Sequence, residues 1–226
     1  MEQIFGVGAL NIAPSNRGFV FAETHKNLQN GEVKNLIAFN EYSFDTNKTT
    51  AITKTAYLNN IFANHSDFLR EQIGDYINIT TAFTPNLGCI ILNPNGIATV
   101  FDYNCNFKFK SNLKYKGYAP SDAVVKGESL WCAYPDSNTI IKYNANSLRQ
   151  EFKISSGVEE ELTEPFSLFP LEDGIVVTSQ STGLVQKVLY DEYKIETMFE
   201  AKEPVQKYIK VDSNEVILTK SGIYKL

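Results

Sequence analysis

Short apolar runs, separated by turns rich in glycine, proline, asparagine and aspartate, recur at a nearly constant spacing along this chain. The segments 82–103 and 123–144 align without a gap at an offset of 41 residues, and each joins strand-like runs through short polar turns. The pattern returns in 167–190 at an offset of 45, and in 208–226 at a further offset of 41. Residues 8–25 contain the first two strands of another copy. This spacing predicts a repeated small sheet rather than a lone meander.

Repeats of this length with four short strands predict an all-β fold, a five-bladed β-propeller of four-stranded antiparallel blades. Near-continuous apolar runs, such as CIIL at 89–92 and LWCAY at 130–134, indicate strands covered on both faces, as stacked blades require. Trp131, in the second of these runs, is therefore interpreted as core between blades. We expect one domain over 1–226, with blades at about 6–73, 74–117, 118–161, 162–204, and 205–226 together with 1–5.

The last copy contains only three strands, whereas residues 1–5, MEQIF, form a β-compatible run without a sheet of its own. We expect this run to supply the missing outer strand and so to close the propeller, removing an exposed sheet edge. The additional residues 57–76 predict a short helical insertion, because Ser66 suits an N-cap and Phe68, Leu69 and Ile73 share one apolar face. The insertion is either a space-filling loop or a lid or docking element.

The segment PSDAVVKGESLWCAYPDSNTIIKYN resembles blades of the NHL-repeat, streptogramin-lyase-like and YncE-like propeller group. The matching positions are Pro120, Ala123, Val124, Leu130, Trp131, Ala133, Asn138, Ile140, Lys142 and Tyr143. The match is good in this blade and reduces to the hydrophobic pattern in the others. The resemblance therefore implies a fold and not an activity, since members of the group include scaffolds, lactone hydrolases and lyases.

Composition narrows the classes of partner. The net charge is −5 and the chain has only three arginines, which argues against a nucleic-acid-binding surface. The N-terminus lacks the pattern of a signal peptide and no apolar run is long enough to span a membrane, so we expect a cytoplasmic protein. Cys89, Cys105 and Cys132 lack metal-ligand spacing and are interpreted as buried, reduced thiols.

Sites in propellers lie at the mouth of the central channel, where the innermost strands begin. By the repeat register, Thr81, Asp122, Phe166 and Lys207 occupy equivalent inner-strand positions, with Asn11 a looser fifth. Glu164 ends the acidic run 158–164 in the loop that enters the fourth blade. These six residues are the candidates for binding a ligand or partner. An alternative is a hydrated channel whose polar groups satisfy one another.

Catalytic chemistry has weaker support. The sequence lacks the pair of inner-strand carboxylates that glycosidases use, because Asp122 is the only clear inner-strand acid. His25 and His65 lie outside the inner strands, and no catalytic residue, metal site or cofactor is predicted. The sequence therefore predicts a non-enzymatic propeller that binds a protein partner or small ligand at one face. Two alternatives are a hydrolase or lyase at the channel mouth, and a structural component of a phage or other multi-subunit particle, in which case it belongs to a virion.

Overall fold

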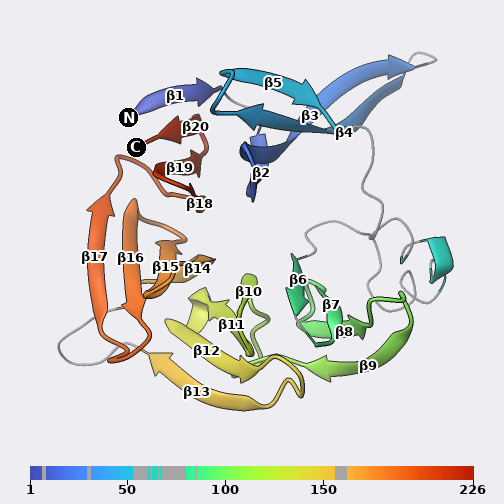
Figure 1. Ribbon diagram of the computed structural model, residues 1–226, viewed down its shortest axis with the longest axis vertical. Coiled ribbons are helices and arrows are strands. Elements are labelled where there is room, and N and C mark those ends of the chain that lie inside the picture. The colour runs from blue at the N-terminus through green and yellow to red at the C-terminus, as the bar shows by residue number, and fades with distance from the viewer. Residues whose placement is uncertain are drawn as a thin grey trace. The chain divides into compact units, whose positions relative to one another are not determined.

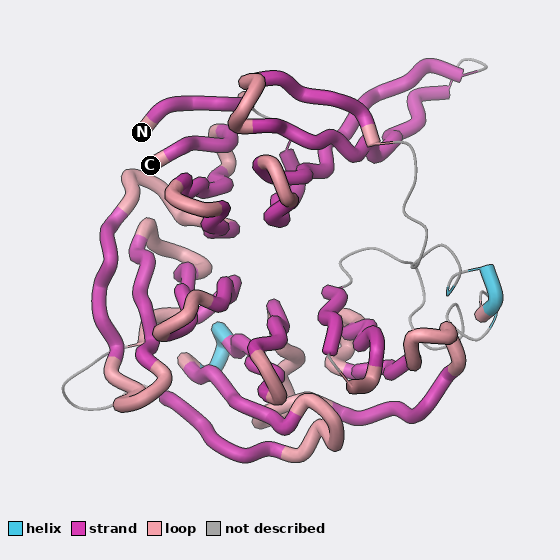
Figure 2. The backbone as a smooth tube through the Cα atoms, viewed as in Figure 1, coloured by secondary structure: helices cyan, strands magenta, loops and turns pink. Residues whose placement is uncertain are grey.

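The computed structural model describes residues 1–6, 9–29, 32–52, 61, 63–65, 67, 80–84, 86–155 and 162–226. Nearly all regular structure in this part of the chain is β-strand (Figure 2). The strands form five four-stranded sheets, and in each sheet neighbouring strands are antiparallel. The predicted fold class, an all-β propeller of five blades, is thus confirmed, and so is the fold-level resemblance to propeller proteins.

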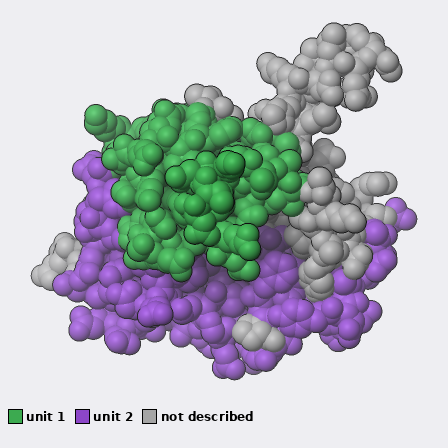
Figure 3. Space-filling model, turned by 45° about the horizontal axis from the view of Figure 1, so that its top comes forward, with its two compact units in different colours: residues 1–54, 201–226 green, residues 55–200 purple. Residues whose placement is uncertain are grey.

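The chain divides into two compact units, residues 1–54 with 201–226, and residues 55–200 (Figure 3). Two blades belong to the first unit. Blade 1 consists of β2 (Ala9–Ser15), β3 (Gly18–Gln29), β4 (Glu32–Ser43) and β5 (Lys48–Ala51). Blade 5 consists of β18 (Lys207–Val211), β19 (Asn214–Thr219), β20 (Gly222–Lys225) and the N-terminal β1 (Glu2–Phe5).

The second unit contains three blades in chain order (Figure 1). Blade 2 consists of β6 (Thr80–Thr84), β7 (Gly88–Leu92), β8 (Ile97–Phe101) and β9 (Phe107–Asn112). Blade 3 consists of β10 (Asp122–Lys126), β11 (Ser129–Tyr134), β12 (Thr139–Asn144) and β13 (Gln150–Ser155), with a 3-10 turn at Pro135–Ser137. Blade 4 consists of β14 (Pro165–Pro170), β15 (Gly174–Ser179), β16 (Leu184–Leu189) and β17 (Ile195–Glu200).

The N-terminal strand completes blade 5, as the three-stranded last copy predicts. β1 pairs with β20, with Glu2 opposite Lys225 and Phe5 opposite Ile223, so the two chain ends lie side by side (Figure 1). Gly222 faces this strand with φ 145°, and a Cβ there would lie 2.2 Å from the backbone oxygen of Phe5. Only glycine allows the approach without displacing β1. The closing strand is confirmed.

The cores of the second unit lie between consecutive blades. One cluster joins blades 2 and 3 and includes Ile90, Val100, Leu130 and Cys132. The other joins blades 3 and 4, and Trp131 belongs to it with 3% of its surface exposed. The interpretation of Trp131 as inter-blade core is therefore correct. Both faces of the middle strands are covered, which explains the continuous apolar runs of the sequence.

Two buried tyrosines make hydrogen bonds at the interface of blades 2 and 3. The Tyr134 hydroxyl donates to the backbone oxygen of Leu113 over 2.5 Å and lies 2.7 Å from the Tyr143 hydroxyl. Burial raises the pKa of Tyr143 to about 12 and also raises the pKa of Tyr134. Both phenols therefore stay protonated at neutral pH, and the buried carbonyl of Leu113 keeps its donor.

Most of the predicted insertion at 57–76, including Ser66, Phe68, Leu69 and Ile73, lies outside the described residues. Of the rest, Ile61 is fully buried and His65 packs on Phe101 with ring centroids 5.1 Å apart. Nε2 of His65 lies 2.6 Å from the backbone oxygen of Cys105. This part of the insertion is packed against blade 2.

Within the described ranges, no helix combines the length and the apolar character that a membrane crossing needs. The three cysteines are buried and unpaired, in agreement with the interpretation as reduced thiols. Burial is the main cause that raises the pKa of Cys89 to about 12, and burial likewise raises the pKa of Cys132.

Candidate functional site

Three of the predicted site residues lie in the second unit on the first strands of their blades: Thr81 in β6, Asp122 at the start of β10, and Phe166 in β14. Thr81 is exposed, Asp122 is buried, and Phe166 is half-buried. Asn11 in β2 and Lys207 at the start of β18 belong to the first unit. Asn11 is exposed and accepts a hydrogen bond from its neighbour Ile12, whereas Lys207 is half-buried.

Asp122 joins blade 3 to blade 4. Its side chain is 6% exposed, and Oδ2 accepts hydrogen bonds from the Ser167 hydroxyl at 2.8 Å and the Leu168 amide at 2.9 Å. Oδ1 accepts from the amide of Ala123 at 2.9 Å. Three donors, two of them from β14, thus converge on one carboxylate, which is the usual way in which a buried acid is satisfied.

Glu164 also makes hydrogen bonds that join these two blades. Its amide donates to Oδ1 of Asn138 in blade 3, and its backbone oxygen accepts from the amide of Gln180 in blade 4, both over 2.9 Å. Its carboxylate is hydrogen-bonded to the Ser181 hydroxyl. Residues 156–161, and with them most of the acidic run 158–164, lie outside the described residues.

The strand pairing differs by one residue from the register that the repeat alignment predicts. The turn between β6 and β7 has three residues, 85–87, whereas the turn between β10 and β11 has two, Gly127 and Glu128. Asp122 pairs with Ala133, and the corresponding pair in blade 2 is Thr80 with Leu92, not Thr81. Because a one-residue shift moves a side chain to the other face of the sheet, Thr81 and Asp122 point to opposite faces of their blades.

A groove at the turn end of blades 3 and 4 was not predicted. It has a volume of about 240 Å³ and is built from the β10–β11 turn, the β14–β15 turn, the β16–β17 turn and the middle of β11 and β12. Its walls are formed by Lys126, Ser129, Trp131, Lys142, Glu172, Tyr190 and Tyr193. All seven residues belong to the second unit, and their backbones are held by two packed sheets.

Three aromatic residues, Trp131, Tyr190 and Tyr193, line this groove. The Trp131 ring centroid lies 5.9 Å from that of Tyr190 and 6.4 Å from that of Tyr193. Phe152 from β13 stacks on Tyr193 at 4.1 Å, and 38% of its surface is exposed. Nζ of Lys142 lies 5.9 Å from the Trp131 ring, within the range of a cation–π contact.

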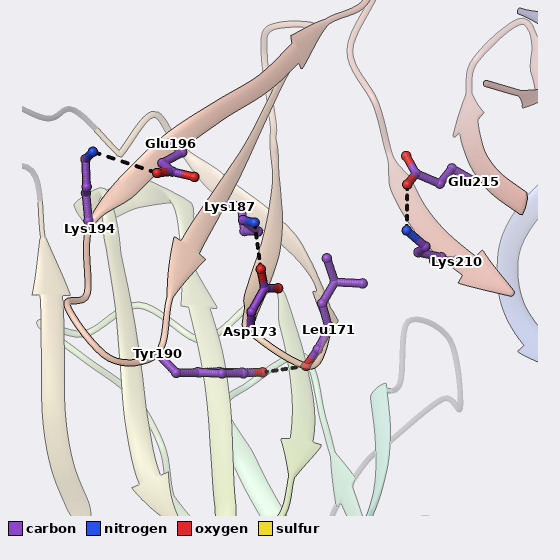
Figure 4. A network of polar contacts seen from close by, with 8 residues as sticks. All are labelled: Leu171, Asp173, Lys187, Tyr190, Lys194, Glu196, Lys210 and Glu215. Atoms are coloured by element: carbon purple, nitrogen blue, oxygen red, sulfur yellow. Dashed lines mark hydrogen bonds and ion pairs between the residues drawn. The ribbon is translucent and has the colours of Figure 1, made fainter. Parts of the chain in front are cut away.

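Polar contacts fix the rim of the groove (Figure 4). The Tyr190 hydroxyl donates to the backbone oxygen of Leu171 over 3.4 Å, and Asp173 in the same turn pairs with Lys187 at 3.0 Å. Burial, and secondarily the charge of Asp173, raises the pKa of Tyr190 to about 12. Tyr190 therefore remains a neutral hydrogen-bond donor at physiological pH, and its ring is held in place.

Tyr193 holds an uncommon backbone conformation. Its φ is 53°, in the left-handed region, where a bulky residue is disfavoured relative to asparagine or glycine. This conformation lets the side chain reach both Phe152 and Trp131 across the junction of the two blades. Asn47, Cys105 and Leu148 have the same left-handed conformation at the fourth residue after β4, β8 and β12, so the conformation belongs to the repeated third turn of the blades.

Among the described residues, no cluster of three or more histidine, cysteine, aspartate or glutamate side chains has an arrangement that would hold a metal ion.

The chain matches no protein-family model and no curated protein. Several solved structures share its fold. The computationally designed Ika4 protein is 12% identical with a TM-score of 0.51, over 68% of this chain and 92% of that one. Sqt1 of Saccharomyces cerevisiae is 11% identical with a TM-score of 0.52, over 96% of this chain and 71% of that one. The WD40 repeats of RRP9 are 9% identical with a TM-score of 0.52, and the match covers 93% of this chain and 57% of that one.

Proposed function

We propose that this protein is a non-enzymatic binding module that contacts a protein partner through the turn end of blades 3 and 4. The observation that carries the proposal is the aromatic groove formed by Trp131, Tyr190 and Tyr193, with Phe152 at its margin. Rigid aromatic side chains contribute large contact area at low entropic cost, and they are enriched at the centres of protein interfaces. The propeller fold of the WD40-type structures is typical of protein-interaction modules.

Blade 2 presents further aromatic surface at its own first and third turns. Phe83 lies near the end of β6, Tyr103 lies in the β8–β9 turn, and Phe107 begins β9. All three side chains are exposed, Tyr103 to 55%. Because β6 and β8 each run toward these turns, the three residues gather at one end of the blade. They form a second exposed aromatic patch in the same unit.

The hydrolase or lyase alternative requires acids that are free to act on a substrate. In the second unit the carboxylate of Asp122 accepts hydrogen bonds that join blades 3 and 4, whereas the carboxylate of Glu164 is hydrogen-bonded to Ser181 within blade 4. This arrangement favours a structural use of the Asp122 carboxylate and leaves the groove as the better-supported site. The channel-mouth residues Thr81, Phe166, Lys207 and Asn11 stay predicted contacts for a small ligand.

Selection from a random 12-residue peptide display library tests the proposal. We expect enriched peptides that bind the purified protein with dissociation constants of about 10–100 µM, a range expected for a short segment in a small groove. The double variant Phe152→Ser/Tyr193→Asn should weaken their binding about tenfold or more, because it removes the stacked pair at the groove margin.

Phe39→Ser is the control, because Phe39 is an exposed aromatic residue of blade 1 and lies outside the groove. It should leave binding of the selected peptides unchanged. Failure to enrich any peptide would contradict the binding-module proposal. Peptides that bind the double variant and the parent protein equally well would place the binding surface elsewhere.

A further inference from the structure

The two long strands of blade 1 extend past the rest of their sheet (Figure 1). β3 and β4 have 12 residues each, whereas β2 has 7 and β5 has 4. β2 pairs with β3 only as far as Glu23, and β5 pairs with β4 only as far as Asn40. Residues 24–29 and 32–37 thus form a two-stranded hairpin, which we call the distal hairpin. Among the described residues, no third strand pairs with it.

We propose that the β4 edge of the distal hairpin pairs with the same edge of a second copy of this chain and forms an antiparallel homodimer. This association is independent of the groove in blades 3 and 4. A two-stranded hairpin alone in water is only marginally stable, and its open edges leave backbone groups without partners. Pairing of two distal hairpins gives a four-stranded sheet, the strand number of each blade of this protein.

The hydrogen bonds of blade 1 show which residues of β4 direct their backbone groups outward. The amide of Ile52 donates to the backbone oxygen of Phe39 over 2.8 Å, so Phe39 directs its backbone groups away from β3. In an antiparallel ladder this direction alternates from residue to residue, and the pairing of β3 with β4 has no register shift. The outward N–H and C=O groups of the distal hairpin on β4 are therefore those of Val33, Asn35 and Ile37.

These three outward positions are complementary to a second copy of themselves. A two-fold axis at Asn35 places this residue opposite its own copy, and places Val33 opposite Ile37 of the second chain. Each such pair can exchange two backbone hydrogen bonds, and valine and isoleucine are favourable cross-strand neighbours. The same axis places Lys34 opposite Leu36, so the two lysines do not face each other. A contact that is the same on both chains closes as a dimer.

The β3 edge of the distal hairpin is less suited to self-pairing. The residues opposite the three outward positions of β4 are Leu28, Lys26 and Thr24. A two-fold axis at the middle position would place two lysines directly opposite each other, which is destabilising. Elsewhere in the protein, the outer strands of blades 2 and 3 carry Lys110 and Lys153, charges of the kind that protects an open edge from pairing. The outward positions of β4 carry no charge.

Sedimentation velocity of the full chain over a range of concentrations tests the association. We expect a reversible monomer–dimer equilibrium with a dissociation constant of about 10–100 µM, because the interface is small. Asn35→Pro removes an outward N–H at the two-fold axis and leaves the β3–β4 ladder intact, so it should weaken dimerisation about tenfold or more. Leu28→Pro is the matched control, because it removes an outward N–H from the other edge of the same hairpin. It should leave the association unchanged.

Cysteine cross-linking tests the register without a change to the backbone. Residues opposite each other in a hydrogen-bonded antiparallel pair have Cα atoms about 5.5 Å apart, within the range of a disulfide. Asn35→Cys should therefore give a disulfide-linked dimer with oxidised glutathione, whereas Ile37→Cys, opposite Val33, should give about fivefold less. The three native cysteines are buried.

Four results would each overturn the inference. They are a chain that stays monomeric up to about 1 mM, equal cross-linking at the two positions, equal loss of the dimer in the two proline variants, and growth into assemblies larger than a dimer. Thermal unfolding of the proline variants checks that each one keeps the fold of the parent protein.

Discussion

Removal of residues 1–5 should lower the free energy of unfolding by roughly 3 kcal/mol, and the melting temperature by about 6–12 °C for a chain of this size. The deletion takes away the outer strand of blade 5, whose backbone pairs with β20. It also removes Phe5, whose ring lies 4.7 Å from that of Phe21 in blade 1. The ladder of β20 is left as an open edge, which should increase aggregation on heating as well.

Thermal unfolding followed by circular dichroism measures the change. A synthetic peptide of residues 1–6 should restore the melting temperature of the truncated protein in a concentration-dependent manner, because it binds the folded state alone. The full-length variant Phe5→Thr separates the two contributions, since it keeps the strand and loses the ring contact. An unchanged melting temperature after the deletion would show that β1 does not stabilise the blade.

Asp122→Ala should destabilise the protein by about 2–4 kcal/mol, the second large effect that the structure predicts. The substitution leaves the amides of Ala123 and Leu168 and the hydroxyl of Ser167 without their acceptor in a buried interface. Asp122→Asn should also be destabilising, because the remaining oxygen still accepts from Ala123 and the Ser167 hydroxyl can rotate to accept from the new amide, but the Leu168 amide then faces a second donor.

Urea unfolding measures both variants, with Asp136→Ala as the control. Asp136 is an exposed acid in the 3-10 turn of the same blade, and its removal should change stability by less than about 0.5 kcal/mol. The result also distinguishes a structural role of Asp122 from a role in binding a ligand. Unchanged stability together with loss of small-ligand binding would make Asp122 a contact residue of the channel mouth, as its place on the inner strand predicts.

The blades could be predicted from the sequence because their signal is local. Apolar runs of strand length, turns at nearly constant spacing and the gapless match of 82–103 with 123–144 each follow from strands that are covered on both faces. The closing strand was predictable for a related reason, since a three-stranded last copy leaves one edge for MEQIF to fill. These features can be predicted without knowing how the blades pack against one another.

The inner-strand register could not be obtained in this way. Alignment of the second and third strands of the blades fixes the repeat period. The register of the first strand, however, depends on the length of the turn that joins it to the second strand. A turn of three residues in blade 2 and two in blade 3 shifts Thr81 against Asp122 by one position. The hydrophobic pattern of these short first strands, TTAFT and DAVVK, is too weak to reveal the shift.

The groove was missed for a different reason. Its residues come from three turns and two strands that are far apart in the sequence, and the contacts of Tyr193 with Trp131 and Phe152 depend on how blade 4 packs on blade 3. Trp131 was correctly interpreted as core, yet this residue of an inter-blade cluster also lines a surface groove. The one available signal was the aromatic turn Tyr190–Tyr193 opposite two lysines, and its meaning needs the blade packing.

Binding of another polypeptide at the turn end of blades 3 and 4 can be observed directly by NMR. The indole N–H of the single tryptophan gives one resonance in a ¹⁵N–¹H correlation spectrum, and it can be followed while a display-selected peptide is added to the whole protein. We expect the Trp131 indole signal to shift saturably, together with the amides of Ser129 and Tyr193, and we expect Tyr193→Asn to abolish the shift. An indole signal that stays in place while amides of other blades move would contradict it.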